Sequence, residues 1–280
     1  MKRSSKSNHV VVRFRGGLGN QLFQYWTAVA LAHRVQADLW FEPGSPPSEI
    51  APVIDLAQAS PEVLQATLGP PGWKGTVVRS IQGVLPARLR RFQQERFGAF
   101  RPGPLGVAGS CFLDGFWQSV RYFSDLPVGD FDNLRARISQ LAASSPWVQA
   151  ARSSVVVHVE RVRHLSMGVA LPGAYYQQAL DRFAGWPVLA VTDDQEFCRQ
   201  VLAGRPGVTL VSSLKMSPWQ TLDLLIHGRA VAASNSTLSW WGAFLNPLAE
   251  QIVVPNGWLA PDLGFVYSLD DLYPPSWVRI

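Results

Sequence analysis

Residues 10–21 of the chain read VVVRFRGGLGNQ, and they open the pattern that indicates its architecture. Three consecutive valines predict a buried strand, and the glycines after them predict a tight turn. Residues 21–35 then place apolar side chains at helical spacing, and residues 38–41, DLWF, predict a second strand. A strand, a turn, a helix and a second strand in this order are typical of a parallel sheet in an α/β protein.

The second half of the chain repeats this alternation of strands and helices. We expect strands at residues 154–159, 188–192, 208–211, 230–233 and 251–254, and helices at residues 173–184, 195–203, 218–227 and 238–245. Such βα repeats with short loops are typical of doubly wound, nucleotide-binding domains. We therefore predict an N-terminal α/β domain at residues 1–145 and a C-terminal one at residues 146–280, with the active site between them. The aromatic tail at residues 271–277 is expected to pack back on the first domain. Within residues 43–104 only a helix near residues 61–68 is predicted.

Composition limits the classes of protein to which the chain can belong. It has 280 residues, of which 47% are hydrophobic and 16% charged, and 11 are tryptophan, which argues against a disordered chain. The net charge of +5 favours an acidic partner, either a nucleotide or the surface of an anionic membrane. Because the lysines and arginines are scattered, nucleic acid is not expected as a partner.

Cysteine usage and hydropathy indicate the compartment. Cys111 and Cys198 lie far apart in apolar segments, so we expect two buried thiols in a reducing compartment. Residues 1–9 are polar and basic with no apolar core after them, unlike a signal peptide. No apolar run approaches the ~20 residues that a membrane-spanning helix needs. We therefore expect a cytoplasmic protein.

Residues 230–243, AVAASNSTLSWWGA, carry the clearest sign of a ligand. The apolar run predicts a buried strand, and Ser234, Asn235, Ser236 and Thr237 follow it at the start of a helix. Their side chains can cap the helix, and the unpaired N–H groups of its first turn can bind an anion, phosphate above all. An ordinary capped turn is the alternative, but the two adjacent tryptophans that follow favour a ligand site.

An acidic pair ends another strand of the same half. Asp193 and Asp194 follow the predicted strand at residues 188–192, at the edge where open α/β sheets bind ligands. They can accept a hydrogen bond from a ribose hydroxyl or a base N–H. The alternative is that one of them caps the following helix.

Mixed charges end a third strand, where residues 158–163 read HVERVR. Arg161 or Arg163 could neutralise a diphosphate, since a guanidinium binds phosphate oxygens in a planar fork. His158 alternates with the valines before it, so a hydrogen-bonded core residue is the alternative to a catalytic one.

In this order the motifs resemble glycosyltransferase family 11, the bacterial and animal α-1,2-fucosyltransferases. The matching stretches are residues 16–25, residues 115–119 with Tyr122-Phe123, residues 192–194, residues 234–245 and residues 273–277. The resemblance spans nearly the whole chain, with residues 43–104 as the gap.

The resemblance implies an α/β fold of the GT-B type, in which two Rossmann-type domains face each other across a cleft. It implies transfer of L-fucose from GDP-fucose to a galactoside 2-hydroxyl with inversion, without a metal or other cofactor. Asp193 and Asp194 would then meet the guanosine, and Ser234, Asn235, Ser236 and Thr237 the phosphates. The cleft on the acceptor side would be lined by Gly17, Gly19, Asn20, Gln21 and Gln118. For bacterial members it also implies work at the inner membrane, for which the basic patch at Arg88, Arg90, Arg91, Arg96 and Arg101 is either a peripheral contact or a solvated loop face.

One motif departs from the family pattern His-x-Arg-Arg-Gly-Asp. The first arginine, expected to neutralise the leaving diphosphate, is Glu160 in this chain, and the Gly-Asp pair is Val162-Arg163. A carboxylate beside a diphosphate is repulsive by ~1 kcal/mol or more, depending on the local dielectric. Our hypothesis is that Arg161 or Arg163 takes over the diphosphate contact and that Glu160 acts as the base.

Two other functions stay open at this point. A family member that binds nucleotide or glycan without turnover would explain Glu160 and Arg163. A Rossmann oxidoreductase would use the turn at residues 16–19 and Glu42 for a dinucleotide, although the turn lacks the third glycine of the G-x-G-x-x-G pattern.

Overall fold

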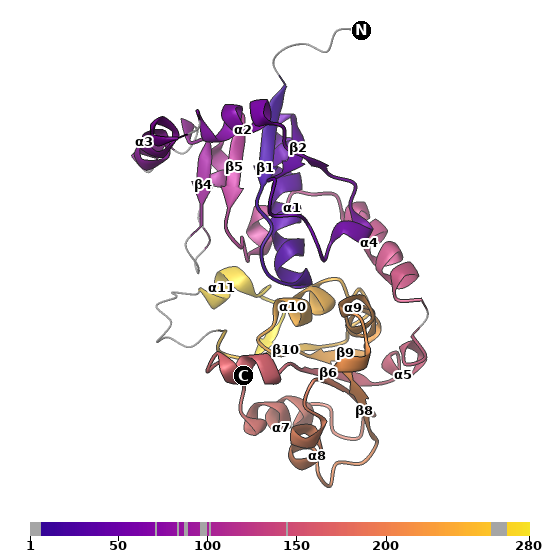
Figure 1. Cartoon of the computed structure of the whole chain (residues 1–280). Coiled ribbons are helices and arrows are strands. Elements are labelled where there is room, and N and C mark those ends of the chain that lie inside the picture. The colour runs from indigo at the N-terminus through magenta and orange to yellow at the C-terminus, as the bar shows by residue number, and fades with distance from the viewer. Residues whose placement is uncertain are drawn as a thin grey trace. The chain divides into compact units, whose positions relative to one another are not determined.

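The computed structural model describes residues 7–70, 72–82, 84–86, 89–95, 100, 102–143, 145–258 and 268–280. The chain divides into two compact units, Met1–Leu126 and Pro127–Ile280. Each unit is built around a parallel β-sheet (Figure 1). The first unit ends at Leu126 rather than at the predicted residue 145, because helix α4 (Val128–Leu141) packs on helix α9 (Pro218–His227) of the second unit.

The first unit holds, among its described residues, a five-stranded sheet in the order β3-β2-β1-β5-β4. The strands are β1 (Asn8–Val12), β2 (Ala37–Phe41), β3 (Ala57–Gln58), β4 (Phe92–Gln94) and β5 (Cys111–Asp114). The helices are α1 (Leu18–Val35), α2 (Pro61–Leu68) and α3 (Trp73–Gln82), with short 3-10 turns at Ala51–Val53, Pro104–Gly106 and Val120–Tyr122. The predicted opening of strand, turn, helix and strand is confirmed, as is the helix at residues 61–68. The valines of β1 are fully buried because β1 lies in the centre of the sheet between helices.

The second unit holds, in its described part, a six-stranded sheet in the order β11-β10-β9-β6-β7-β8. The strands are β6 (Val155–Val159), β7 (Val188–Thr192), β8 (Val208–Ser212), β9 (Ala230–Ala232), β10 (Ile252–Val254) and β11 (Val278–Arg279). Besides α4 and α9, the helices are α5 (Val148–Ala151), α6 (Val162–Ser166), α7 (Gly173–Asp181), α8 (Gln195–Val201), α10 (Thr237–Phe244) and α11 (Leu269–Leu272), with a 3-10 turn at Ser213–Lys215. The predicted α/β class with two parallel sheets is therefore confirmed.

Helices cover both faces of the second sheet, which explains why the central strands β6, β7 and β9 are buried at every position. Val155 and Val157 of β6 pack with Tyr176 of α7 and Cys198 of α8 on one face. On the other face, His158 is hydrogen-bonded to a residue of α10. Figure 1 shows α7 and α8 on one side of this sheet and α9 and α10 on the other.

The two adjacent tryptophans belong to the core of the second unit and not to a ligand site. Trp240 and Trp241 are 1% and 0% exposed. The Trp240 ring stacks on Phe244 with centroids 4.9 Å apart, and its Nε1 donates a hydrogen bond to the carbonyl of Leu272 at 2.8 Å. Trp277 of the tail also contacts Trp240, with centroids 5.6 Å apart. The tail thus packs within its own unit, and its contact with the first domain stays a prediction.

Cys111 and Cys198 are both buried free thiols, as the sequence predicts. Burial raises the pKa of the Cys111 thiol to about 12, so this side chain is a neutral core residue. None of the helices in the described part of the chain is long and apolar enough to cross a bilayer.

A buried carboxylate joins α4 to α9. Asp223 of α9 is 2% exposed and accepts a hydrogen bond from the Ser139 hydroxyl of α4 at 2.7 Å. The Nδ1 of His227 lies 3.3 Å from the Oδ1 of Asp223 and 2.9 Å from its backbone carbonyl oxygen. The hydrogen bond to Asp223 raises the pKa of His227 above its ordinary value, although burial opposes this.

Replacing Asp223 by Asn is expected to lower the pKa of His227, which an NMR titration of the imidazole protons measures. Because the folded-state pKa of wild-type His227 is raised, its protonation stabilises the fold fully below the unfolded pKa of about 6.5. That contribution is lost as the pH rises through the folded-state pKa. The free energy of unfolding of wild type should therefore exceed that of His227→Gln by an amount that decreases between pH 6 and pH 9. A difference that does not change with pH would contradict the pairing.

Candidate active site

The candidate site of the second unit lies at the carboxyl ends of β6, β7 and β9. From β6 the chain continues to β7 and β8 on one side of the sheet, whereas β9 pairs with β6 on its other side. Strand order therefore reverses beside β6, and open α/β sheets bind ligands outside the carboxyl ends of strands at such a point. The segments that leave these ends are Glu160–Arg161 after β6, Asp193–Asp194 after β7 and Ala233–Ser236 after β9.

Asp193 and Asp194 hold the neighbouring loops in place. The carboxylate of Asp193 accepts hydrogen bonds from the backbone N–H groups of Arg161 at 2.8 Å and Val162 at 2.9 Å. These are N–H groups at the start of α6, which a short helix leaves without intrahelical partners. Asp194 caps α8 by accepting from the N–H of Phe197 at 3.0 Å. Capping is thus what the structure shows for this pair, and their contact with guanosine stays a prediction.

The two candidate arginines have different surroundings. The Arg161 Nε lies 3.4 Å from the Oδ2 of Asp194, and its guanidinium carbon lies 3.8 Å from the centroid of the Phe197 ring. These contacts hold Arg161 against α8. Arg163 of α6 has a side chain 62% exposed, with its Nε 4.0 Å from the Oε1 of Glu160. Of the two arginines, Arg163 is the more exposed and is therefore better placed to contact a bound ligand.

Glu160 lies between α6 and the start of α10, and its side chain is 24% exposed. Burial pushes the pKa of Glu160 up, but His158 and a hydrogen bond with Ser236 push it down. The charges of His164 and Arg163 add to the lowering, so the pKa lies below its ordinary value. Glu160 is consequently a carboxylate at neutral pH, held at the N-terminus of α10.

His158 is a core residue rather than a solvent-facing one. It is 3% exposed, and its Nδ1 lies 2.6 Å from the Oγ of Ser239 in α10. That Oγ is 2.9 Å from the Oγ of Ser234, so the three side chains form a buried hydrogen-bonded chain. Burial lowers the pKa of His158, although the charge of Glu160 opposes this.

The predicted phosphate-binding stretch is divided between the interior and the surface. Asn235 is 5% exposed, and its Nδ2 donates to the carbonyls of Val169 at 2.8 Å and Trp258 at 2.9 Å. Ser236 caps α10 by accepting from the N–H of Leu238 at 3.3 Å. Thr237, at the first position of α10, is partly exposed. Ser234, Asn235 and Ser236 are thus buried, Thr237 is the more accessible residue, and the phosphate contact of this stretch stays a prediction.

The predicted acceptor-side residues lie in the first unit around the start of α1. Gly17 caps the helix and Gly19 is buried in its first turn. Asn20 and Gln118 are brought together from 98 positions apart, with the Gln118 Nε2 donating to the Asn20 Oδ1 at 2.8 Å. The Oε1 of Gln21 accepts from the N–H of Glu49 at 3.0 Å, so Gln21 supports the adjacent loop.

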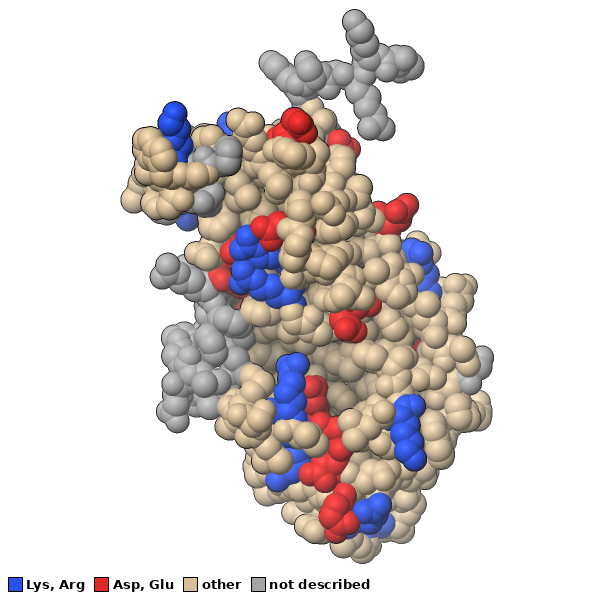
Figure 2. All heavy atoms as spheres, in the orientation of Figure 1, with Lys and Arg blue, Asp and Glu red and all other residues tan. Residues whose placement is uncertain are grey.

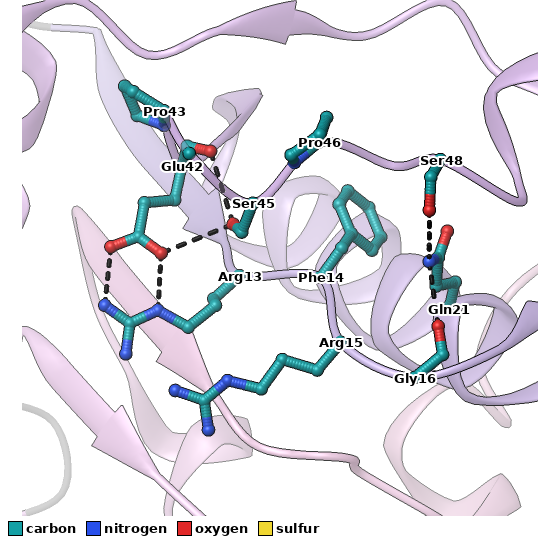
Figure 3. Close-up of a pocket in the computed structure, with 11 residues that line it drawn as sticks. Arg13, Phe14, Arg15, Gly16, Gln21, Glu42, Pro43, Ser45, Pro46 and Ser48 are labelled. Atoms are coloured by element: carbon teal, nitrogen blue, oxygen red, sulfur yellow. Dashed lines mark hydrogen bonds and ion pairs between the residues drawn. The ribbon is translucent and has the colours of Figure 1, made fainter.

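An open pocket of about 540 Å³ lies beside this turn (Figure 3). Of the predicted acceptor residues only Gln21 lines it, together with Arg13, Phe14, Arg15, Gly16, Glu42, Pro43, Gly44, Ser45, Pro46 and Ser48. Arg13 forms a two-pronged ion pair with Glu42, and its Nη1 lies 2.9 Å from the Oδ2 of Asp114. The Nη2 of Arg15 lies 3.1 Å from the other oxygen of Asp114.

This charged network was not predicted from the sequence, although the positions of its residues at strand ends could have indicated it. Arg13, Glu42 and Asp114 stand at the carboxyl ends of β1, β2 and β5, which are neighbours in the sheet. The hydrogen bond to Glu42 raises the pKa of Arg13 further, although burial opposes this. The oxidoreductase alternative requires Glu42 to bind a ribose. Arg13 already occupies both carboxylate oxygens of Glu42, which argues against that role.

Comparison with known proteins decides between a glycosyltransferase and the oxidoreductase alternative. The sequence model of glycosyl transferase family 11 matches residues 91–280, which is more than half of the chain. The chain belongs to this family. The oxidoreductase alternative is therefore wrong, and the predicted family is confirmed.

Curated relatives of this family 11 chain carry two different sugars in their names. It is 24% identical to an alpha-1,2-colitosyltransferase of Escherichia coli, over 97% of this chain and 98% of the relative. It is 26% identical to the galactoside 2-alpha-L-fucosyltransferase Sec1 of Mus musculus, over 96% of this chain and 73% of the relative.

Solved structures of low identity share the fold of this family 11 chain. A mutant of FUT1 from Arabidopsis thaliana in complex with GDP has a TM-score of 0.51 and 10% identity, covering 98% of this chain and 76% of that one. The fucosyltransferase NodZ from Bradyrhizobium has a TM-score of 0.51 and 18% identity, covering 89% of this chain and 95% of that one. The neighbours are GT-B proteins, so the predicted GT-B-like fold class is confirmed.

The described residues contain no group of three or more His, Cys, Asp or Glu side chains that could hold a metal ion. Transfer without a metal or other cofactor stays a prediction.

Proposed function

We propose that this family 11 glycosyltransferase transfers L-fucose from GDP-fucose to the 2-hydroxyl of a galactoside, with inversion at the sugar. The observation that carries the proposal is the meeting of Glu160, Ser236 and the start of α10 at the switch point of the second sheet. This geometry supplies a carboxylate beside helix N–H groups that favour an anion. The names of the two curated relatives support a fucosyl or closely related donor.

In the proposed reaction the acceptor hydroxyl attacks the anomeric carbon from the face opposite GDP. The new glycosidic C–O bond forms as the C–O bond to the diphosphate breaks, and GDP leaves with that electron pair. Glu160 takes the hydroxyl proton, since it is ionised at neutral pH and partly exposed. The first-turn N–H groups of α10 and the exposed guanidinium of Arg163 stabilise the negative charge of the leaving diphosphate.

The predicted partners of the other site residues are part of the same proposal. Thr237 would bind a phosphate oxygen. Asp193 and Asp194 would accept hydrogen bonds from the guanosine through carboxylate lone pairs that their capping bonds do not use. On the acceptor side, the pair Asn20 and Gln118 and the pocket lined by Gln21 would hold the glycan. Sugars bind well where polar groups lie next to an aromatic ring, and Arg15 and Phe14 both line this pocket.

A second candidate function is supported by one contact. The hydrogen bond between Glu160 and Ser236 places a carboxylate at the helix N-terminus where a phosphate is expected. A family member with this arrangement could bind nucleotide or glycan without turning it over. The two candidates differ in a measurable way, because only the transferase releases GDP.

Calorimetry with GDP and an assay of GDP release from GDP-fucose test the proposal directly. We expect GDP to bind with a Kd on the order of 1 μM to 1 mM, and release of GDP to require a β-galactoside acceptor. ADP and UDP serve as matched controls for the base. A parallel assay with the colitosyl nucleotide decides between the donors that the relatives suggest. GDP binding with no release over hours, from either donor and across an acceptor panel, would leave the non-catalytic candidate.

We further propose that the chain works in the cytoplasm on a nucleotide sugar and a glycan, with no nucleic acid partner and no cofactor. Peripheral contact with the inner membrane was suggested by the basic patch. Of this patch, Arg88, Arg96 and Arg101 lie outside the described residues, whereas Arg90 and Arg91 lie within them. Fractionation of cells that express the chain, with and without a high-salt wash, tests this location.

A further inference from the structure

Helix α3 of the first unit presents its apolar side chains to solvent. Trp73, Val77 and Ile81 recur at every fourth position, which places them along one stripe of the helix. They are 73%, 51% and 49% exposed. The chain then continues with Val84, which is 85% exposed, and Leu89, which is 56% exposed. Amphipathic helices normally bury such a stripe against the core. An apolar stripe that is exposed instead is typical of an interaction surface.

The stretch of sequence that contains this stripe carries only positive charge. No Asp or Glu occurs in the sequence between Glu62 and Glu95, whereas five cations do: Lys74, Arg79, Arg88, Arg90 and Arg91. Lys74 is held next to Trp73, with its Nζ 5.9 Å from the centroid of the indole ring. Figure 2 shows blue and tan atoms but no red ones over the part of the first unit where α3 lies in Figure 1. An apolar stripe within a purely cationic stretch of chain matches a surface that is apolar inside and anionic outside.

We propose that α3, with Val84 and Leu89, docks in the plane of an anionic lipid bilayer. The apolar side chains would enter the boundary between headgroups and acyl chains, with Trp73 at the level where indole rings are enriched in membranes. The cations would pair with acidic headgroups, each contributing on the order of 1 kcal/mol near the membrane surface. This attachment surface shares no residue with the proposed transfer site. It includes part of the basic patch, to which it adds the exposed apolar side chains of α3, and it deepens the peripheral location proposed above.

A second copy of the chain fits the surface less well than a bilayer does. A two-fold contact through α3 would bring the cations of one copy against those of the other, which is repulsive. The helix has 10 residues and is therefore about 15 Å long. A stable protein interface buries roughly 800 Å² on each partner, which is more than one short stripe supplies. A bilayer needs neither shape complementarity nor a large rigid surface.

Sedimentation with lipid vesicles tests the proposal. The full chain should bind vesicles of phosphatidylcholine and phosphatidylglycerol (3:1), and bind pure phosphatidylcholine at least about tenfold more weakly. The triple variant Trp73→Ser, Val77→Ser, Ile81→Ser should partition at least about tenfold less onto the anionic vesicles. The matched control Val128→Ser, Leu214→Ser, Leu248→Ser alters side chains that are 74%, 75% and 69% exposed elsewhere, and it should bind like wild type. Added salt should weaken the binding of wild type to the anionic vesicles. Lys74→Glu should bind these vesicles more weakly than wild type at the same salt concentration.

Several outcomes would overturn the docking surface. Equal vesicle binding by wild type and the triple variant would do so, as would no binding by wild type at low salt. Sedimentation equilibrium identifies the rival partner: a dimer that the triple variant abolishes, without vesicle binding, would assign the stripe to a second copy. Unchanged circular dichroism and thermal unfolding of the triple variant show that it is folded.

Discussion

Glu160→Gln is expected to reduce GDP release from the sugar nucleotide by about 10²–10⁴-fold, the range typical for loss of a general base. Gln has nearly the same size and can keep a hydrogen bond with Ser236, so the loop between β6 and α6 should stay in place. The amide cannot take the acceptor proton. It also removes the negative charge at the start of α10, so GDP should bind as tightly as to wild type or more tightly.

The two measured quantities separate the candidate functions. A fall in turnover with GDP binding maintained supports Glu160 as the base. Turnover that stays within twofold of wild type would sink that assignment. If wild type has no turnover and Glu160→Gln binds GDP more tightly, Glu160 acts as a resident anion and the chain is a binding protein. Glu196→Gln is a suitable control, because this carboxylate is exposed and paired with Arg199 on α8.

The pH dependence of the rate gives an independent check. The pKa of Glu160 lies below its ordinary value, so the residue is already ionised throughout pH 5.5–8. Its protonation should lower the rate only in more acidic solution. An acid limb near pH 6.5 that persists in Glu160→Gln would point to another group as the base.

Gly242→Ala is expected to destabilise the second unit by about 1–3 kcal/mol, although alanine normally stabilises a helix. A Cβ atom at Gly242 would lie 2.3 Å from the Cβ of Leu225, which is fully buried on α9. Both atoms are close to the backbone, so no side-chain rotation relieves the contact and the two helices must separate. Since α10 begins at the proposed phosphate site, the same shift should weaken GDP binding.

Thermal and urea unfolding measure this effect, and two further variants show its cause. Gly129→Ala lies in α4 with no atom within 4 Å of the added Cβ, and it should stabilise by about 0.5–1 kcal/mol. Combining Gly242→Ala with Leu225→Ala should cost less than the sum of the two single changes. A stabilising Gly242→Ala would show that α9 and α10 are packed less closely than the structure has them.

The strands and helices of the chain could largely be predicted because their patterns are local. Strands β1 and β6 each contain three consecutive buried valines, as central strands covered on both faces require. Strand β4 (Phe92–Gln94) and helix α3 were not predicted. Phe-Gln-Gln carries no strand signature of its own, and α3 shows its apolar stripe to solvent, so neither follows from the burial pattern of a core.

The site could be located from the sequence but not described from it. The motifs after β6, β7 and β9 were predicted to carry ligands, and the structure brings these three strand ends to neighbouring positions. The role of each side chain was harder to predict. The carboxylate of Asp193 is used by backbone N–H groups 31 and 32 positions away, and Trp240 packs against a tail 37 positions further on.

Residue patterns along the chain therefore establish the parallel α/β fold and the family, since strand periodicity, glycine turns and helix caps depend on neighbours in sequence. Only the three-dimensional structure shows which polar groups already have partners. Glu42 is paired with Arg13, the amide nitrogen of Asn235 with two carbonyls and His158 with Ser239. Glu160, Arg163 and Thr237, in contrast, keep access to solvent. The physical reason is that a hydrogen bond or ion pair forms between atoms a few ångströms apart in space. In this site such atoms belong to residues that are far apart in the sequence, so the sequence does not show which of them are partners.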